Sequence, residues 1–304
     1  MILVSNLTFQ STVTLRDGNT MPILGYSATE HSYSYVTQTE IFLDAIELGY
    51  RYFDLSYDDD CLIPLRRAIE RSGIDREEFF VSCRFGDAQN RGTPGAGTAN
   101  ELFEQFGGPI DLVSLPWPYY ASMNNAWSGP IGYTKLANGY PSGMQNFYPD
   151  VMPEIGVCNF DIKHFESLKE YEAFRFLPFV NQNQFHPLYT CKELRQYCKD
   201  NGIVFVKNFE KNDVVEVKKP TYATDVTKNG EYFIVSERER KANELNLQMY
   251  TNAIHKLLIK QGSPQGEAME KDLFDFELTK GEMNCIDSFN MDKRFGYHPD
   301  YQDF

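Results

Sequence analysis

AIELGYRYFDLSY, residues 45–57, decides the fold, because a helix ends within it and a strand follows at once. Apolar residues at helical spacing run up to Gly49, and a glycine can adopt the left-handed conformation that ends a helix. Thr37 and Glu40 form a capping box that is expected to begin this helix. Tyr50–Ser56 then has the composition of a buried strand. The segment therefore predicts one helix and one strand of an α/β protein.

The same alternation of helix and strand recurs along the chain. Asp161 can cap a helix, Thr190 with Glu193 forms a second capping box, and Thr279 begins a last short helix. The strand candidates are Met21–Ser27, Tyr50–Ser56, Phe79–Phe85, Ile110–Trp117, Ile155–Phe160, Phe179–Phe185 and Ile203–Phe209. Most of them are apolar on both faces, as buried parallel strands are, so we expect a parallel sheet with crossover helices.

Three regions interrupt this alternation. Gly86–Gly97 and Pro118–Pro153 are rich in Gly, Pro, Asn, Tyr and Ser at places where crossover helices are expected. We therefore predict shortened helices or remodelled, long loops there. The third region, Lys211–Glu237, is charged but contains the strand-like patches Val214–Val217 and Tyr232–Val235.

Composition bounds the class of protein. The chain has 304 residues and is 42% hydrophobic, which is enough for one large core. Its net charge of −14, without a basic stripe, argues against nucleic-acid partners. No run approaches the roughly 20 apolar residues of a membrane span, and the first residues do not resemble a signal peptide. The six cysteines form no CxxC pair, as expected of reduced thiols. We expect a cytoplasmic protein with a single domain over residues 1–304.

Several segments, in order along most of the chain, resemble the aldo-keto reductases. They are LRDGNTMPILGYSATE (15–30), AIELGYRYFDLSY (45–57), DLVSLPWP (111–118), EIGVCNF (154–160), FVNQNQFHP (179–187), ELRQYCKDNGIVF (193–205) and the C-terminal residues 274–304. The resemblance implies a (β/α)8 TIM barrel. It also implies the chemistry of the family, which is hydride transfer from a nicotinamide cofactor to a carbonyl.

The resemblance locates the catalytic positions of the family. The family uses a Tyr as general acid, a Lys paired with an Asp to lower the pKa of that Tyr, and a His that orients the carbonyl. Here Asp54 matches the Asp, but the Tyr position is Asp59 and the nearest phenol is Tyr57. The Lys position is Arg84 and the His position is Pro116. We therefore predict that ordinary carbonyl reduction is lost and that Asp54 and Arg84 remain as an ion pair between strand ends.

The cofactor site is altered as well. Asn159 and Gln182 match the residues that hold the nicotinamide carboxamide in the family, whereas Asn208–Glu210 replaces the segment whose aromatic residue stacks on the nicotinamide. Too few residues precede the C-terminal match for the eighth strand of the family and its phosphate-binding motif, and Glu267–Asp272 is acidic. We therefore expect no cofactor. The eighth strand is either missing or supplied by Tyr232–Val235.

Other chemically notable residues favour structural roles. His186 has no second His or Cys near it in sequence, so we expect a packed, hydrogen-bonded histidine. Cys158 has no matched base nearby and is interpreted as a buried thiol. The run Asp58–Asp60 is interpreted as a solvated loop, because three adjacent carboxylates do not converge easily on a cation.

Together these observations predict a non-catalytic aldo-keto-reductase-like protein, a pseudoenzyme that serves as a structural component of a larger protein assembly. Aromatic side chains in stretches such as Pro118–Tyr120 and Tyr297–Tyr301 would contact the partner proteins, and cytoskeletal or axonemal assemblies are the first setting to consider. The alternative is a divergent NADP(H)-dependent reductase of small carbonyl compounds, in which Tyr57 and Arg84 perform acid catalysis and NADPH binds. A third possibility is a barrel mouth that binds another small molecule. Neither nucleic acid nor a membrane is an expected partner.

Overall fold

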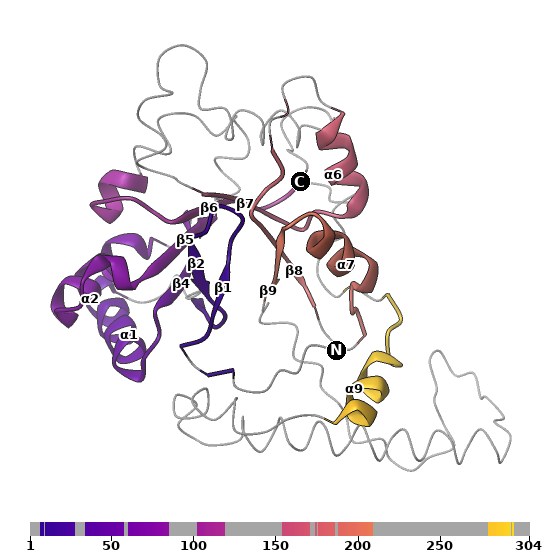
Figure 1. Cartoon of the computed structure of the whole chain (residues 1–304). Coiled ribbons are helices and arrows are strands. Elements are labelled where there is room, and N and C mark those ends of the chain that lie inside the picture. Colours follow the sequence, from indigo (N-terminus) through magenta and orange to yellow (C-terminus); the bar gives the residue numbers. More distant parts are fainter. Residues whose placement is uncertain are drawn as a thin grey trace, which may run out of the picture. The chain divides into compact units, whose positions relative to one another are not determined.

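Figure 1 shows the computed structural model of the chain. It describes residues 7–8, 10–27, 34–57, 60–84, 102–118, 154–170, 174, 176–185, 188–208, 279–292 and 294. The chain divides into two compact units, of which the first contains residues 1–184, 191–208 and 297–304 and the second residues 185–190 and 209–296. The single domain over residues 1–304 stays a prediction.

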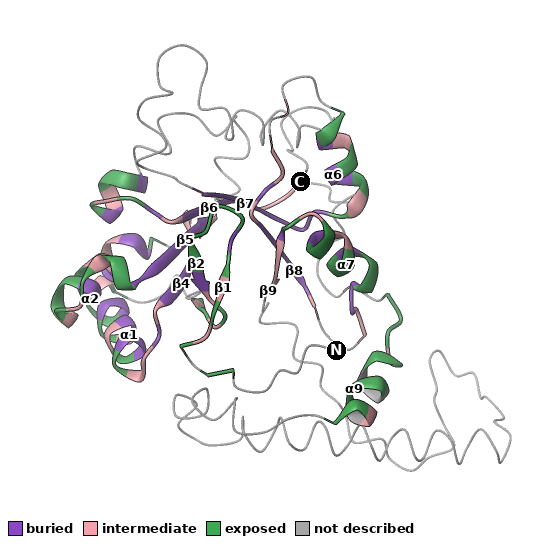
Figure 2. Ribbon diagram, viewed as in Figure 1, coloured by how far each residue is buried: buried purple, intermediate pink, exposed green. Residues whose placement is uncertain are grey.

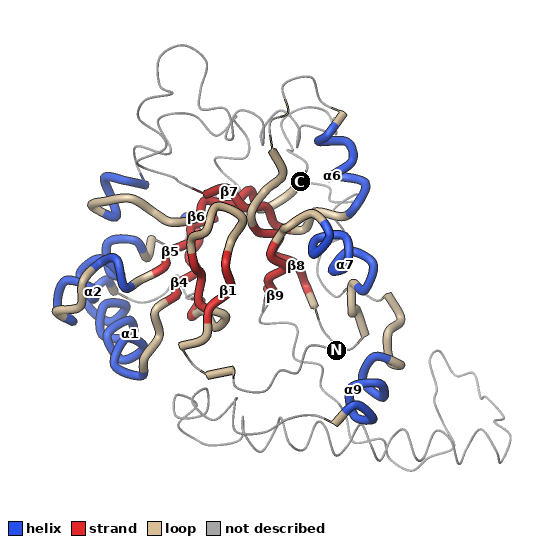
Figure 3. Tube along the Cα trace, in the orientation of Figure 1, coloured by secondary structure: helices blue, strands red, loops and turns tan. Residues whose placement is uncertain are grey.

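A seven-stranded parallel sheet forms the centre of the first unit. Its strands pair in chain order, each with the next one along the sequence. They are β3 (Tyr26–Ser27), β4 (Tyr52–Ser56), β5 (Phe80–Arg84), β6 (Leu112–Leu115), β7 (Glu154–Cys158), β8 (Val180–Gln184) and β9 (Val204–Asn208). Figure 3 shows these strands as a curled sheet with the helices outside it. Consecutive parallel pairing is the arrangement that a TIM barrel requires.

The first strand candidate along the chain does not form a single strand in the structure. Met21–Ser27 was predicted as one strand, but it contains the end of β2 (Thr20–Pro22) and, after a break, the whole of β3. The break follows from Gly25, where an added Cβ would lie 2.6 Å from the Tyr52 ring, so the chain passes close against the sheet. β2 instead pairs with β1 (Thr12–Thr14) in an antiparallel hairpin. Each of the other six candidates coincides with an observed strand.

The hairpin packs against the amino-terminal ends of the sheet strands. Leu15 and Met21 of the hairpin form a buried cluster with the first residues of four strands, Tyr52, Phe80, Leu112 and Val180. Alternate residues of a strand point to the same face, so Asp54, Ser82 and Gln182 lie one step further along this inner face. Figure 2 shows that most residues of β4 to β8 are buried. The carboxyl ends of the strands therefore lie opposite the hairpin, where TIM barrels place their active sites.

The outer helices of the first unit are α1 (Tyr35–Leu48), α2 (Leu62–Ser72), α6 (Ile162–Lys169) and α7 (Lys192–Asp200), with a short 3-10 helix, η2 (Arg76–Glu78). Gly49 ends α1 at φ 108°, as predicted, but the helix begins one turn earlier than the sequence suggested. Its cap is Ser34, whose side chain accepts from the Thr37 N–H. Asp161 caps α6 as predicted. The capping box at Thr190 is wrong, because Cys191 precedes α7 and makes no side-chain cap.

The second unit is described over fewer residues. Its helix, α9 (Lys280–Asp287), begins directly after Thr279, as predicted. Two hydrogen bonds join the segments of this unit, from the Thr190 N–H to Asn290 Oδ1 at 2.9 Å and from the Met291 N–H to the Leu188 carbonyl at 3.0 Å. Residues 209–278, which include the candidate strand Tyr232–Val235 and the acidic stretch Glu267–Asp272, lie outside the described residues.

Two further sequence expectations concern the state of the cysteines and the absence of membrane-spanning segments. The cysteines that the structure describes are buried and in no disulfide, and they are Cys61, Cys83, Cys158, Cys191 and Cys198. Within the described ranges, no helix combines the length and the apolar character that a membrane crossing needs.

Candidate active site

Polar side chains gather on the inner face of the sheet, beyond the layer that contacts the hairpin. Asp54 of β4, Ser82 of β5 and Gln182 of β8 are all buried there. In the ladder Asp54 pairs with Ser82, and Cys158 of β7 pairs with Gln182. The sequence brings these residues together because each lies at an inward position of a parallel strand.

Asp54 is the centre of this cluster, and the residue is 5% exposed. Ser82 Oγ donates to Asp54 Oδ1 at 2.6 Å, and Gln182 Nε2 donates to Asp54 Oδ2 at 2.9 Å. Arg84 Nη2 lies 3.8 Å from the same Oδ2. The structure thus places the predicted ion pair between Asp54 and Arg84. Two charge-assisted hydrogen bonds hold the carboxylate in position beside that cation.

The Gln182 amide connects Asp54 to Cys158. Cys158 Sγ donates to Gln182 Oε1 at 3.5 Å. Burial raises the pKa of the Cys158 thiol to about 12. The thiol is therefore protonated at neutral pH and is not a nucleophile, in agreement with its interpretation as a buried thiol. Gln182 keeps one N–H and one oxygen lone pair that these two contacts do not use.

Asn159 and Pro116 meet next to this cluster. Asn159 has the left-handed backbone conformation, with φ 62°, which asparagine tolerates better than most residues. Its N–H donates to the Gln182 carbonyl at 2.9 Å, and its side-chain Nδ2 donates to the Pro116 carbonyl at 3.0 Å. Pro116, which has no polar side chain, thus contributes a backbone acceptor. Asn159 joins the carboxyl ends of β6, β7 and β8.

Tyr57 follows β4 directly and is half-buried. It comes after Ser56, the residue that pairs with Arg84 in the ladder. Asp58, Asp59 and His186 lie outside the described residues. Asp60 is the described member of the acidic run, and it accepts a hydrogen bond from the Tyr35 hydroxyl at 2.8 Å.

Sequence comparison with the family missed two members of the cluster, Ser82 and Tyr52. Tyr52 Oη lies 3.2 Å from Ser82 Oγ. Burial, and after it the Asp54 carboxylate, raise the pKa of the Tyr52 phenol far above its ordinary value, so Tyr52 does not serve as a proton donor. Both residues could have been found from period-two spacing, because Tyr52 precedes Asp54 by two residues and Ser82 precedes Arg84 by two.

The fold agrees with comparisons against known proteins. The family model described as "Aldo/keto reductase family" matches residues 23–211. A glyoxal reductase of Bacillus subtilis is 27% identical over 296 residues, which cover 96% of this chain and 97% of that protein. The methylglyoxal reductase DkgA of Escherichia coli O157:H7 is 25% identical over 291 residues, covering 95% of this chain and 96% of that protein.

Solved structures give the same result for the fold. An aldo/keto reductase from Brucella melitensis has a TM-score of 0.64 at 19% identity, covering 92% of this chain and 99% of that one. A Bombyx mori aldo-keto reductase in complex with NADP has a TM-score of 0.63 at 22% identity, covering 95% of both chains. With the parallel sheet in barrel order, these matches show a TIM-barrel fold. The chain belongs to the aldo-keto reductase family.

These findings correct the functional prediction. A non-catalytic scaffold is wrong, because relatives that match over nearly the whole chain are named as reductases. The prediction gave three changed side chains more weight than a fold-wide match. The expectation of no cofactor likewise finds no support, since a structural neighbour contains NADP. Nor do the comparisons support a cytoskeletal association. Protein contacts through aromatic loops stay a prediction.

Proposed function

We propose that the protein is an NADP(H)-dependent aldo-keto reductase that reduces small carbonyl compounds of the glyoxal and methylglyoxal class. The observation that carries this proposal is the match, over nearly their whole length, to relatives with those reductase names. The buried, charged cluster around Asp54, at the active-site end of the strands, supports it independently.

The residues at the strand ends fit a nicotinamide. Gln182 keeps an N–H donor and an oxygen lone pair, which are the partners that a carboxamide needs. Asn159, fixed by its bond to the Pro116 carbonyl, lies beside it. NADPH, when bound, supplies the hydride. The chain itself then has to position the carbonyl and provide one proton to its oxygen.

Tyr57 is the candidate proton donor and Arg84 the cation that assists it. A cation near a phenol stabilises the phenolate that remains when the phenol gives up its proton. Arginine stays charged throughout, and Asp54 fixes its position through the ion pair. In this arrangement Arg84 performs the role that the family gives to a lysine.

Replacing Tyr57 with phenylalanine tests this assignment. Turnover is expected to fall by about 100-fold, the usual contribution of a general acid, while the Kd of NADPH stays within about twofold. NADPH consumption at 340 nm and NADPH fluorescence measure the two quantities. Tyr197→Phe is the matched control, because Tyr197 lies on α7 and its hydroxyl donates to Glu166. Full turnover by Tyr57→Phe would remove Tyr57 from the mechanism.

The proposal as a whole is tested by turnover. Purified protein is mixed with NADPH and with glyoxal or methylglyoxal, and NADPH consumption is followed with the hydroxy-carbonyl product. Saturable, enzyme-dependent consumption that matches product is the expected result. Absence of product with both substrates at millimolar concentration overturns the substrate class.

A further inference from the structure

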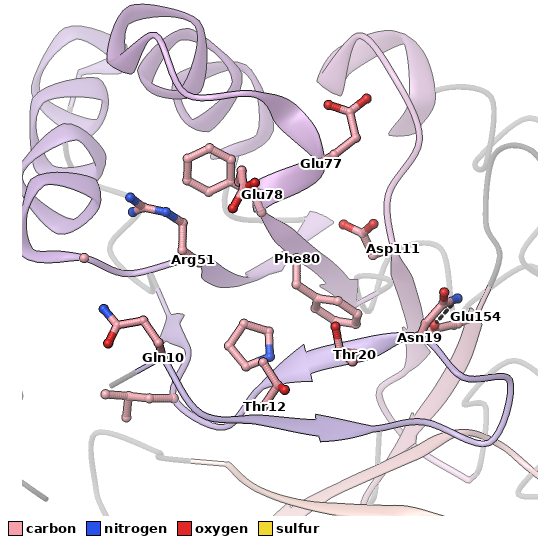
Figure 4. Close-up of a pocket in the computed structure, with 14 residues that line it drawn as sticks. Gln10, Thr12, Asn19, Thr20, Arg51, Glu77, Glu78, Phe80, Asp111 and Glu154 are labelled. Carbon is pink, nitrogen blue, oxygen red and sulfur yellow. Dashed lines mark hydrogen bonds between the residues drawn. The ribbon is translucent and has the colours of Figure 1, made fainter. Parts of the chain in front are cut away.

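A cavity of about 490 Å³ lies at the amino-terminal end of the strands, next to the hairpin. It is bordered by β1 and β2, by η2, and by the residues that begin β5 and β7, as Figure 4 shows. Its volume falls in the range of small-molecule sites, roughly 300–1,000 Å³. The cluster around Asp54 lies further along the strands, so the cavity is separate from the proposed active site.

The charges around the cavity are predominantly acidic. Glu77, Glu78, Asp111 and Glu154 line it, together with one basic residue, Arg51. Arg51 already donates to the carbonyls of Ile46 and Tyr50. Asp111 accepts from Arg76 at 2.7 Å and from the Val81 N–H at 2.7 Å. The local field therefore favours a cation, because the Glu77 and Glu78 carboxylates add negative charge to that of Asp111.

Glu154 is the unusual member of this set. It occupies the first position of β7, whereas the corresponding first residues Tyr52, Phe80 and Val180 are packed in the cluster under the hairpin. Glu154 is 1% exposed, and its Oε1 accepts from Asn19 Nδ2 at 3.0 Å. Its Oε2 is buried without a hydrogen-bond partner among the described residues. A buried carboxyl oxygen without a hydrogen-bond partner calls for a polar group on a ligand.

The titration of Glu154 agrees with this geometry. Burial raises the pKa of its carboxyl to about 8, against the Asn19 hydrogen bond, which lowers it. The charge of Asp17, a hydrogen-bonding interaction with the Asp17 carboxyl and the charge of Asp111 raise it further. Near pH 7 only about a tenth of the carboxyl groups are then ionised. A bound cation would shift the group to its carboxylate form.

We propose that this cavity binds a small organic cation with a primary ammonium group, which donates to Glu154 Oε2 while its apolar part lies against Pro22, Leu24 and Phe80. The apolar wall favours an organic cation over a bare metal ion. In addition, the part of the chain that the structure describes contains no group of three or more His, Cys, Asp or Glu side chains suited to a metal. On binding, the Glu154 carboxyl releases its proton to solvent and the ammonium group keeps its own.

Calorimetry on the full chain tests the proposal with butylammonium and phenethylammonium as probes. Each is expected to bind with one-to-one stoichiometry, to release close to one proton per molecule at pH 6, and to bind roughly tenfold more tightly at pH 7 than at pH 6. Two buffers of different ionisation enthalpy measure the proton release. Tetramethylammonium, which has no N–H donor, is expected to bind at least tenfold more weakly.

Glu154→Gln provides the matched variant, because the glutamine oxygen can still accept from Asn19. It is expected to weaken both probes at least tenfold and to abolish the proton release, whereas Glu193→Gln, on the exposed face of α7, changes neither. Turnover of methylglyoxal should persist in Glu154→Gln, which shows that the variant is folded. The proposal is overturned if neither probe binds at pH 8, if tetramethylammonium binds equally well, or if a folded Glu154→Gln binds like the wild type.

Discussion

Substituting asparagine for Asp54 is expected to lower methylglyoxal turnover at least about a hundredfold. The asparagine amide would present N–H donors where Gln182 Nε2 and Ser82 Oγ now donate, so one of these bonds is lost. Arg84 also loses its carboxylate partner. Asp54 is a positioning residue in this account, because it acts through Arg84 and Gln182.

The same substitution is expected to reduce the free energy of unfolding by about 3–5 kcal/mol, since it leaves a mostly buried guanidinium without its counter-charge. Urea denaturation measures this loss, and steady-state kinetics separate kcat from the KM for NADPH. A positioning role predicts changes in both, because Gln182 contacts the proposed cofactor site. Asp44→Asn, exposed on α1, is the control. Wild-type kinetics in a folded Asp54→Asn protein would show that the cluster has no part in the reaction.

The second large effect concerns stability and pH. The pKa of the Glu154 carboxyl is raised to about 8 in the folded chain, above the ordinary value of about 4.5 in the unfolded chain. The folded state therefore binds the proton more tightly than the unfolded state. The stabilisation that the bound proton gives the folded state is complete below about pH 4.5 and is lost as the pH rises through 8. Wild-type protein should lose a few kcal/mol of stability relative to Glu154→Gln across this range.

Denaturant unfolding of both proteins between pH 5 and pH 9 measures this difference. The free energies of unfolding of the wild type and Glu154→Gln are expected to differ least at pH 5 and most at pH 9. As the pH rises, the variant becomes increasingly the more stable protein. The other carboxyl groups titrate alike in both proteins, so their effect cancels in the difference between the two free energies of unfolding. Glu193→Gln should run parallel to the wild type. If the wild type instead becomes more stable relative to the variant as the pH rises, the pKa of Glu154 is not raised.

Local sequence patterns predicted most of the secondary structure. Runs such as Phe79–Phe85 and Phe179–Phe185 predicted strands because buried parallel strands are apolar on both faces. Gly49 and Asp161 marked helix ends through backbone and side-chain chemistry that acts within one turn. Ser34 was missed as a cap because Thr37, one turn later, offers the same chemistry.

What the sequence could not show depends on tertiary contacts. The strand candidate Ile155–Phe160 omitted Glu154, since a charged residue before an apolar run is typical of a loop. Only the hairpin, which brings Asn19 onto Glu154, explains its burial. In the same way Tyr52 and Ser82 became part of the site through the pairing of β4 with β5.

The function was misjudged for a different reason. The displaced tyrosine, with Asp59 at its family position, and the changes to Arg84 and Pro116 were taken together as a loss of the acid, of the group that tunes it and of the group that orients the carbonyl. In the structure Asp54 and Arg84 still form a charged pair within a hydrogen-bonded cluster, and Pro116 contributes a carbonyl to Asn159. Changed residue types are therefore compatible with a site that retains a cation and a carboxylate.

NADPH binding tests the central claim most directly, because a reductase of this family requires it whatever its carbonyl substrate. Purified protein is titrated into NADPH while the nicotinamide fluorescence is followed, and Gln182→Ala is titrated in parallel. We expect saturable, one-to-one binding with a Kd in the micromolar range, weakened about tenfold in Gln182→Ala through the loss of its amide contacts. No saturable change at protein concentrations up to about 1 mM would contradict the assignment of the protein as an NADP(H)-dependent reductase.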